Sequence, residues 1–335
     1  MLELSVMNDF DLIAIGDIVT DAFIRLKEAE VHCDVNRENC TISLPFAEKI
    51  PYEDVFIVPA VGNSPNAAVA ASRLGLKSAI ATNIGDDENG QHCLDKLKKE
   101  GVATDFVLVQ EGKKSNYHYI LWYADDRTIL IKHEKFDYKL GNLDTPKWVY
   151  LSSLGENSLD FHKEIAGWLK TKPEIKLAFQ PGTYQMNFGK EKLKDIYERT
   201  NIFFSNVEEA ERILEIDTLG IQELLVRIHA LGPKIVVITD GPKGAYVYDG
   251  GKTLFVTPYP DPKPPFERTG AGDALSSTVV SALALGNDLE TALKWGAINS
   301  MSVVQKIGAQ EGLLSREEIE KYLASAPAEF VVKEA

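Results

Sequence analysis

Short apolar segments alternate with helical patterns along most of the 335-residue chain. The segments with the pattern of buried strands are Leu12 to Ile15, Ser78 to Asn83, Trp148 to Leu151, Lys176 to Phe179, Ile202 to Ser205 and Ile235 to Thr239. The predicted helices between them are Ala67 to Leu74, Gly90 to Glu100, Phe161 to Lys170, Glu208 to Glu215 and Ile221 to Leu231. This alternation predicts an α/β fold with a doubly wound, mostly parallel sheet flanked by helices.

Two segments break the alternation. Ala22 to Val58 is long, mixed in character and poor in helix signal. In Ser115 to His133, apolar residues alternate on both sides of a turn at Asp125-Asp126-Arg127, which predicts a hairpin. The two segments together predict a small antiparallel sheet attached to the main layer, with ordinary edge strands as the alternative.

Local signals also predict where some helices begin and end. Ser64 is placed to cap the first helix, Pro65 suits its first turn and Gly75 suits its end. Arg316 to Leu323 has the pattern of a terminal helix, and we expect the residues that follow it to be frayed.

The charge balance limits the possible partners. The formal net charge of −14 disfavours nonspecific nucleic-acid binding and an anionic membrane surface, although a local pocket can still take an anionic substrate. No apolar run approaches the roughly 20 residues that span a bilayer, and no signal peptide is visible. Cys33, Cys40 and Cys93 form a sparse, odd set without paired metal-ligand spacing, which favours a reducing compartment. We therefore expect a cytoplasmic protein with no nucleic-acid or membrane partner.

The chain changes from a Pro-rich loop to a helix within Thr269 to Leu275, whose sequence is TGAGDAL. Gly270 and Gly272 allow backbone N–H groups to approach an anion, and the start of a helix adds partial positive charge. Asp273 would then lie where a general base is needed, beside a phosphate about to be transferred. A capped helix start with glycine for tight packing is the structural alternative.

The core of this stretch, Gly270, Ala271, Gly272 and Asp273, resembles the second signature of the ribokinase-like (PfkB) carbohydrate kinase family, D-T-x-G-A-G-D. Further matches in the correct order extend from Gly16 to Gly308, so the resemblance covers nearly the whole chain. It implies one ribokinase-like kinase domain over residues 1–335, in which a small sheet inserted at about 22–58 and 115–133 is a lid over the sugar site and a homodimer surface.

The resemblance also implies a reaction. ATP and Mg²⁺ would phosphorylate a hydroxyl of a small-molecule sugar or sugar derivative, or of a nucleoside. Asp273 would take the hydroxyl proton, and the backbone N–H groups of Gly270 to Asp273 would stabilise the transferred phosphoryl group. The other possibilities are nucleotide hydrolysis without an acceptor and a non-catalytic sugar or nucleotide sensor. The sensor is disfavoured by Asp273, because a sensor has no need of a base.

The predicted acceptor site lies near the N-terminus. Asp21 matches the family's aspartate that accepts hydrogen bonds from sugar hydroxyls, although a solvated turn aspartate is the alternative. Gly62, Asn63 and Asn66 lie in a segment that resembles the family's G-G-x-x-x-N signature, with Val61 in place of the first glycine. Gly62 would let the acceptor approach the backbone, and Asn66 can donate to and accept from a hydroxyl.

The predicted nucleotide site combines two motifs. The first resembles T-x-G-x-x-G, in which a plain turn is the alternative, and comprises Thr239, Gly241, Lys243 and Gly244. Lys243 would supply charge near the phosphates. The second, Asn206 and Glu209, resembles N-x-x-E, in which the Glu organises Mg²⁺ through water and the Asn lies near phosphate. The same two residues also form a capping-box pattern.

Two further assignments concern single residues. Asn299 lies on a predicted helix whose counterpart in the family often contacts adenine, although a lone helical Asn is usually polar surface. Glu267 replaces an aspartate whose neighbourhood binds a monovalent cation in many relatives, so dependence on potassium stays open.

Overall fold

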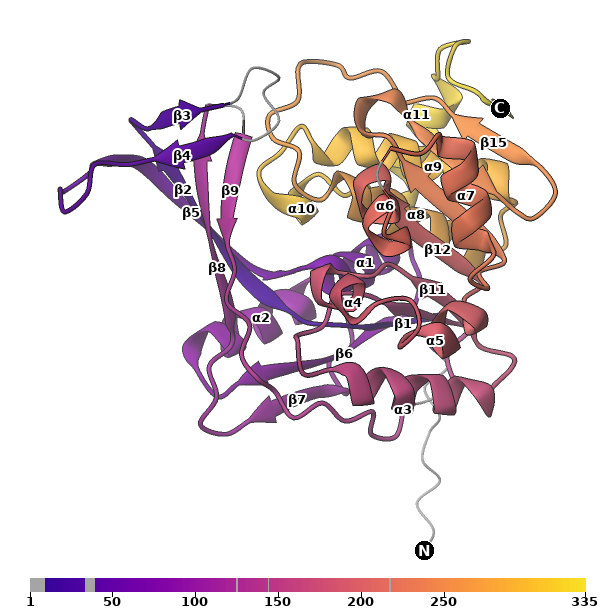
Figure 1. Cartoon of the computed structure of the whole chain (residues 1–335), viewed down its shortest axis with the longest axis horizontal. Helices are drawn as coiled ribbons and strands as arrows, with labels where there is room; N and C mark the ends of the chain where they lie inside the picture. Colours follow the sequence, from indigo (N-terminus) through magenta and orange to yellow (C-terminus); the bar gives the residue numbers. More distant parts are fainter. Residues whose placement is uncertain (1–9, 34–39, 125, 144, 217) are drawn as a thin grey trace, which may run out of the picture.

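The computed structural model describes residues 10–33, 40–124, 126–143, 145–216 and 218–335. Its main layer is a ten-stranded sheet in the order β16-β15-β14-β13-β12-β11-β10-β1-β6-β7 (Figure 1). These strands are β1 Leu12–Ile15, β6 Ser78–Gly85, β7 Val107–Gln110, β10 Trp148–Leu151, β11 Lys176–Phe179, β12 Ile202–Asn206, β13 Ile235–Thr239, β14 Ala245–Tyr248, β15 Thr253–Val256 and β16 Val332–Glu334. The seven strands from β13 to β7 are parallel, and β14, β15 and β16 extend the sheet antiparallel.

Helices cover both faces of this sheet (Figure 1). Their bounds are α1 Asn63–Arg73, α2 Glu88–Lys99, α3 Leu159–Lys170, α4 Thr183–Phe188, α5 Lys194–Arg199, α6 Val207–Leu214, α7 Ile221–His229, α8 Ala271–Ala284, α9 Leu289–Val303, α10 Gly308–Glu311 and α11 Arg316–Ala324, with a 3₁₀ turn at Gly241–Lys243. β1 contributes Leu12 and Ala14 to the core that contains α1, α8 and α9, and Ile13 and Ile15 to the core that contains α3, α6 and α7. A strand buried on both faces needs such a continuous apolar run, so the predicted doubly wound α/β fold is confirmed.

Two predictions about element ends are wrong. Gly62, not Ser64, is the N-cap of α1, because Ser64 is fully buried and its hydroxyl pairs with that of Ser152 at 2.6 Å. The C-terminal residues are not frayed, since β16 pairs antiparallel with β15.

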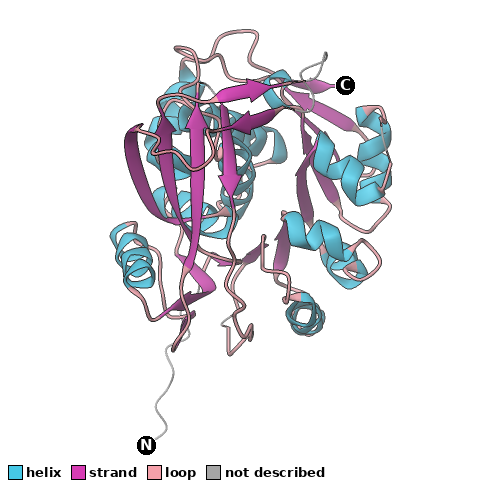
Figure 2. Cartoon of the chain, turned by 60° about the vertical axis from the view of Figure 1, so that its left-hand side comes forward, coloured by secondary structure: helices cyan, strands magenta, loops and turns pink. Residues whose placement is uncertain are grey.

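The two segments that interrupt the alternation form a second sheet, which we call the lid sheet (Figure 2). Its order is β5-β2-β8-β9, and its strands are β2 Val19–Leu26, β5 Tyr52–Val61, β8 Asn116–Tyr123 and β9 Asp126–Leu130. A separate antiparallel pair, β3 Glu30–His32 and β4 Thr41–Ser43, extends from it. The turn residue Asp125 and residues 34–39 lie outside the described residues.

The lid sheet is mixed rather than purely antiparallel, because β2 and β8 are parallel neighbours. The main sheet explains this difference. β2 follows β1 and β8 follows β7, and both strands leave the same edge of a parallel sheet, so they set out in the same direction.

Cys33 and Cys40, which flank the ends of β3 and β4, form a disulfide, whereas Cys93 is a buried thiol. The inference from the cysteines to a reducing compartment therefore loses its support, and a cytoplasmic location stays a prediction. Among the helices of the described residues, none has the length and apolar character that a membrane crossing requires.

Candidate active site

The carboxyl ends of the parallel strands meet at one edge of the main sheet, where ligands bind in open α/β folds. Asp17 follows β1, Gln180 follows β11, Asn206 ends β12 and Thr239 ends β13. The first turn of α8, which carries Asp273, lies against this edge, since Gln180 donates to the Asp273 carboxylate.

The start of α8 requires one glycine for its backbone and leaves the other open to a ligand. Gly270 is the N-cap with φ 80°, and a Cβ there would lie 2.3 Å from the Cβ of Ala309. Only glycine fits this left-handed, crowded position. A Cβ on Gly272 would meet no atom within 4 Å, so internal packing does not explain this glycine. Open space beside the first N–H groups of a helix suits an anion.

Three side-chain amides hold the Asp273 carboxylate. The amide of Asn63 donates to Oδ1 at 2.7 Å, that of Gln180 donates to Oδ1 at 3.0 Å, and that of Asn66 donates to Oδ2 at 2.8 Å. The structure thus brings the predicted Asn63 and Asn66 to the predicted base, and both amides bind the base itself. Gln310 fixes Asn66 in turn by donating to its Oδ1 at 3.0 Å.

Gln180 was not assigned to the site from the sequence. Its own orientation is fixed because Tyr150 and Ser276 donate to its Oε1, so its amide N–H must face Asp273. The sequence feature that could have identified Gln180 is its position directly after a buried strand, at the sheet edge where ligands bind.

Burial raises the pKa of Asp273, the donors Asn66, Gln180 and Asn63 lower it, and the charge of Asp21 raises it. The net effect is a pKa above the usual range of an aspartate. A carboxylate with a raised pKa is a stronger base, which is the change that proton abstraction near neutral pH calls for.

Of the predicted acceptor residues, Asn63 and Asn66 contact Asp273, and Asp21 lies close enough for its charge to raise the pKa of Asp273. Gly62 has φ 114°, and a Cβ there would lie 3.1 Å from the carbonyl oxygen of Asp17. Asp21 lies within 3.4 Å of the Nδ1 atom of His118. Neither Asp17 nor His118 was assigned from the sequence. The place of His118 beside Asp21 depends on the pairing of β2 with β8.

A cavity of about 390 Å³ lies on the other side of the α8 turn. It is lined by residues that include Asn206, Thr239, Gly241, Gly244, Ala271, Gly272, Glu208, Arg268, Ala297, Ser300 and Met301. The first six were predicted for the nucleotide or phosphoryl site, so the structure brings them together. Arg268 was not assigned, although a basic residue directly before an anion-binding turn is a usable signal.

Two predicted nucleotide contacts are not on this cavity. Lys243 has a side chain that is 74% exposed and bonds the carboxylate of Asp240 at 3.1 Å. Asn299 is fully buried, donates to Thr278 Oγ1 at 2.7 Å and accepts from the backbone N–H of Leu314 at 2.9 Å. Asn299 therefore ties α9 to α8 and to Leu314, two residues before α11, and these contacts give no support to its assignment to adenine.

Asn206 and Glu209 form the capping box at the start of α6. The backbone N–H of Glu209 donates to Asn206 Oδ1 at 2.7 Å, and that of Asn206 donates to Glu209 Oε2 at 2.9 Å. Burial, followed by the charges of Asp273 and Glu208, raises the pKa of Glu209 although its bond from Asn206 opposes this. A nearby cation would offset the repulsion among the carboxylates of Glu209, Asp273 and Glu208. The described residues contain no cluster of three or more His, Cys, Asp or Glu side chains that would ligate a metal directly.

Glu267 fastens the loop before the α8 turn. Its buried carboxylate accepts from the backbone N–H of Thr269 at 2.7 Å and from that of Gly308 at 2.9 Å. The residue that departs from the family signature thus links the turn to the start of α10.

Comparisons with known proteins show what the whole chain is similar to. A sequence model described as pfkB family carbohydrate kinase matches residues 44–316. The 5-dehydro-2-deoxygluconokinase of Bacillus velezensis is 27% identical over an alignment of 341 residues, covering 93% of this chain and 94% of the relative. The nucleoside kinase of Methanocaldococcus jannaschii superposes with a TM-score of 0.78 at 21% identity, covering 95% of this chain and 99% of that one. The ribokinase of Arabidopsis thaliana, complexed with ribose and ATP, superposes with a TM-score of 0.79 at 19% identity, covering 94% and 99%.

Proposed function

Because the chain belongs to the pfkB family of carbohydrate kinases, we propose that it transfers the terminal phosphoryl group of ATP to a hydroxyl of a sugar or sugar derivative. One observation carries this proposal. The carboxylate of Asp273 is held by three amides, has a raised pKa, and lies in the first turn of a helix whose glycine-rich start faces an open cavity.

Asp273 is the general base in this proposal. With Asn63 and Gln180 on Oδ1 and Asn66 on Oδ2, the carboxylate cannot rotate freely, so its remaining lone pairs keep a fixed direction. An acceptor hydroxyl bound there gives its proton to Asp273 as its oxygen attacks phosphorus, and ADP departs as the leaving group.

The start of α8 supplies the electrostatic part of catalysis. The first turn of α8, from Gly270 to Asp273, would present its N–H groups to the transferred phosphoryl oxygens, for which Gly272 leaves room. The N–H group of Ala271 makes a long bond of 3.5 Å to the carbonyl of Arg268, which the phosphoryl group would replace. Preorganised N–H donors need no reorganisation as charge develops on these oxygens. Arg268, on the same cavity, adds positive charge.

Magnesium fits the acidic end of this site. Oxygen ligands suit Mg²⁺, which keeps most of its waters in proteins, and Glu209 is a partly buried carboxylate whose orientation Asn206 fixes. Glu209 would hold the ion through water and Asn206 would lie near phosphate. When bound, Mg²⁺ neutralises the charge of the nucleotide phosphates.

A nucleoside is the second candidate acceptor. The rings of His133 and Tyr184, 5.5 Å apart, offer aromatic surface near the acceptor residues. Trp122, on the inner face of the lid sheet, is 6% exposed and covered by Phe266 and Arg25, so its ring is not open to a base. A non-catalytic sensor is the least favoured reading, since it gives no reason for the three amides on Asp273.

An acceptor panel tests the proposal directly. ATP and Mg²⁺ are supplied with ribose, fructose, adenosine, inosine or cytidine, and ADP release is measured with and without each acceptor. We expect acceptor-dependent ADP release with a free sugar. Strong turnover of a nucleoside alone would select the second candidate, and acceptor-independent release would indicate a hydrolase. Tight ATP binding without any turnover would favour a sensor.

A further inference from the structure

Two histidines lie beside the two aspartates on the acceptor side of Asp273. His118 on β8 is the register partner of Asp21 on β2, so the pairing of the lid sheet brings them together. His133 lies beyond the end of β9, and its Nδ1 atom is 3.0 Å from Oδ2 of Asp17. The two imidazole centroids are 5.2 Å apart. Of these two histidines and two aspartates, the sequence motifs predicted only Asp21 as a site residue.

Asp17 holds His133 in place. Its carboxylate is 4% exposed and also accepts the hydroxyl of Tyr138 at 2.9 and 3.1 Å. Burial and the charge of Asp17 raise the pKa of Tyr138, so the phenol keeps its proton and remains a donor. The ring of His133 packs edge-on against Tyr184. With Nδ1 bound to Asp17, the Nε2 atom of His133 is left for another partner.

The second pair is incompletely satisfied. Within the described part of the chain, Nε2 of His118 and Oδ1 of Asp21 are buried without a hydrogen-bond partner. The 3.4 Å separation between Asp21 Oδ1 and His118 Nδ1 is an electrostatic contact rather than a well-formed hydrogen bond. A buried donor or acceptor without a partner is costly. An unpaired imidazole nitrogen and an unpaired carboxylate oxygen on neighbouring side chains suit the hydroxyl groups of a ligand.

The charges around these four side chains limit the class of ligand further. The side-chain partners of Asp17, Asp21 and Asp273 are histidine, tyrosine, asparagine and glutamine, and no lysine or arginine is among them in the described residues. The charge of Asp21 already raises the pKa of Asp273. A phosphate or carboxylate on the acceptor would lie among three carboxylates, which is unfavourable.

Resting on the proposed kinase function, we propose that His118 and His133 bind hydroxyl groups of an uncharged, polyhydroxylated acceptor, and that the pocket rejects acceptors carrying a phosphate or carboxylate. Free sugars and the ribose of a nucleoside meet this description. The pocket would thus select against sugar acids, although a relative of this chain is named 5-dehydro-2-deoxygluconokinase.

The first test compares matched neutral and anionic acceptors. Binding is measured by calorimetry, and turnover by ADP release, for ribose, ribose 5-phosphate and ribonate, for fructose and fructose 6-phosphate, and for inosine and inosine 5′-monophosphate. A neutral control, 5-deoxyribose, lacks the hydroxyl that the 5-phosphate blocks. We expect the preferred neutral acceptor to bind on the order of 10-fold or more tightly than its anionic partners. Tighter binding of an anionic partner would overturn the proposal and identify the histidines as an imidazolium site for anions.

The second test separates the two ring nitrogens. The amide of Asn overlays Nδ1 of histidine and that of Gln overlays Nε2. His133→Asn should therefore keep the bond to Asp17 but lose the acceptor, weakening acceptor binding about 3- to 10-fold, while His133→Gln should retain most of it. His118→Asn and His118→Gln should behave likewise. The exposed His92, changed to Asn, is the matched control and should leave both acceptor and ATP binding unchanged.

The two tests distinguish failure of the histidine proposal from failure of the kinase proposal. Absence of phosphoryl transfer with every acceptor would contradict the kinase proposal, whereas acceptor binding by calorimetry would still test the histidines. Unchanged acceptor affinity in His118→Asn and His133→Asn, with melting temperature and ATP affinity like wild type, would overturn the inference.

Discussion

In the proposed mechanism, the basicity of Asp273 depends on neighbours from three distant parts of the chain. α1 supplies Asn63 and Asn66, the end of β11 supplies Gln180, and β2 supplies the charge of Asp21. The amides favour the ionised carboxylate, while burial and Asp21 favour the protonated one, and the second group prevails. The residue is therefore oriented by hydrogen bonds and kept basic by its surroundings.

This balance predicts how kcat/KM depends on pH on the acidic side. The base must be ionised, so kcat/KM should fall as pH drops through the raised pKa of Asp273, above the usual value of 3.8 for an aspartate. Gln180→Leu removes a donor that lowers this pKa, so its acidic limb should move to higher pH. Initial rates across pH, alongside thermal melts at each pH, check this. If kcat/KM of Gln180→Leu falls at the same acidic pH as that of wild type, the account is contradicted.

Glu209 allows a capping role and a magnesium role to be told apart. If Glu209 also organises Mg²⁺, Glu209→Gln should raise the Mg²⁺ concentration needed for half-maximal activity several-fold. Its glutamine amide oxygen can still accept from Asn206, so the loss of stability should be about 1 kcal/mol or less. A Mg²⁺ titration beside a thermal melt checks both. An unchanged Mg²⁺ profile would leave Glu209 as a cap alone.

At the scale of elements, a partly buried ion pair connects α1, the end of α2 and α10. Arg73 donates to both oxygens of Glu100 at 2.9 Å and to the carbonyls of Gln310 and Leu313 at 2.7 and 2.8 Å. Because Gln310 in turn donates to Asn66, this network extends to the helix that orients the base.

The same pair predicts a pH-dependent stability. The hydrogen bond from Arg73 lowers the pKa of Glu100 to about 2 from 4.5. A depressed carboxylate contributes stability that is fully present above its unfolded pKa and is lost as pH falls towards its folded pKa. Glu100→Gln should therefore lower the free energy of unfolding by about 2 kcal/mol at pH 7, and by less near pH 3. Denaturant titrations at both pH values measure it.

The control for this change is Glu317→Gln, since Glu317 is 79% exposed in its pair with Lys321. It should alter stability by about 0.5 kcal/mol or less. If Glu100→Gln and Glu317→Gln change the free energy of unfolding equally, the Arg73–Glu100 pair stabilises the fold no more than an exposed pair, which contradicts the prediction.

Local sequence patterns predicted the helices and strands better than the contacts between distant elements. The strands β1, β10, β11 and β13 have the predicted bounds, because strands buried on both faces carry an unbroken apolar run. β16 was missed because its partner β15 lies far earlier in the chain. Gln180 and the face of α9 that buries Asn299 were missed for the same reason, since long-range packing decides which way a side chain points.

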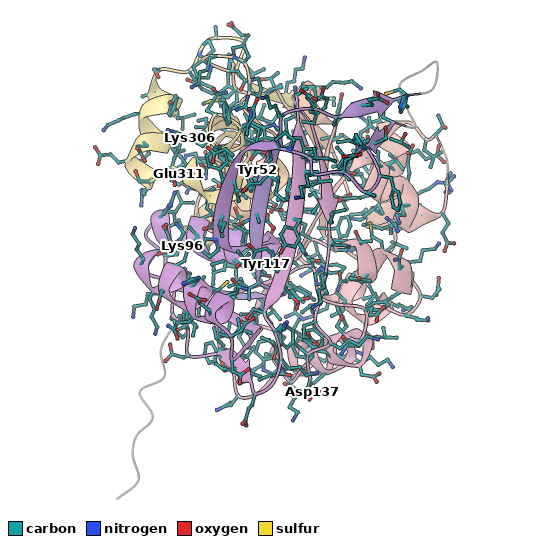
Figure 3. The ribbon with its side chains drawn as sticks, turned by 90° about the vertical axis from the view of Figure 1, so that its left-hand side faces the viewer. Tyr52, Lys96, Tyr117, Asp137, Lys306 and Glu311 are labelled. Carbon is teal, nitrogen blue, oxygen red and sulfur yellow. A yellow bond between two sulfur atoms is a disulfide. The ribbon has the colours of Figure 1, made fainter. Side chains whose placement is uncertain are left out.

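At the scale of the whole molecule, the lid sheet is turned towards the viewer in Figure 3, where Tyr117 is labelled on it. Its outer face carries exposed apolar side chains. Strand register places Ile57, Ala22, Tyr119 and Leu130 in one row across the sheet. Ile57, Tyr119 and Leu130 are 61%, 50% and 51% exposed, whereas the small Ala22 between them is 2% exposed. Tyr117 packs its ring 5.1 Å from that of Tyr119. Contiguous exposed apolar surface marks interaction sites, so the predicted homodimer through the lid remains our expectation.

Charged substitutions test that expectation. Tyr119→Asp together with Leu130→Asp would place two carboxylates in the row, so the double variant should be monomeric where the wild-type chain is a dimer. Light scattering after size-exclusion chromatography measures the mass. Val109→Asp, at an apolar position of β7 that is 55% exposed and outside the lid, is the control and should leave the mass unchanged. A monomeric wild-type chain at tens of micromolar would contradict a stable lid dimer.

The most direct test of the whole account is the turnover of Asp273→Asn. The substitution keeps the shape of the side chain and removes the base, so kcat should fall roughly 10²–10⁴-fold while ATP affinity changes little. Asp160→Asn, at an aspartate that is 92% exposed on α3, is the matched control and should keep wild-type turnover. The account predicts a folded, ATP-binding and nearly inactive variant. Near wild-type turnover in a correctly folded Asp273→Asn protein would contradict it.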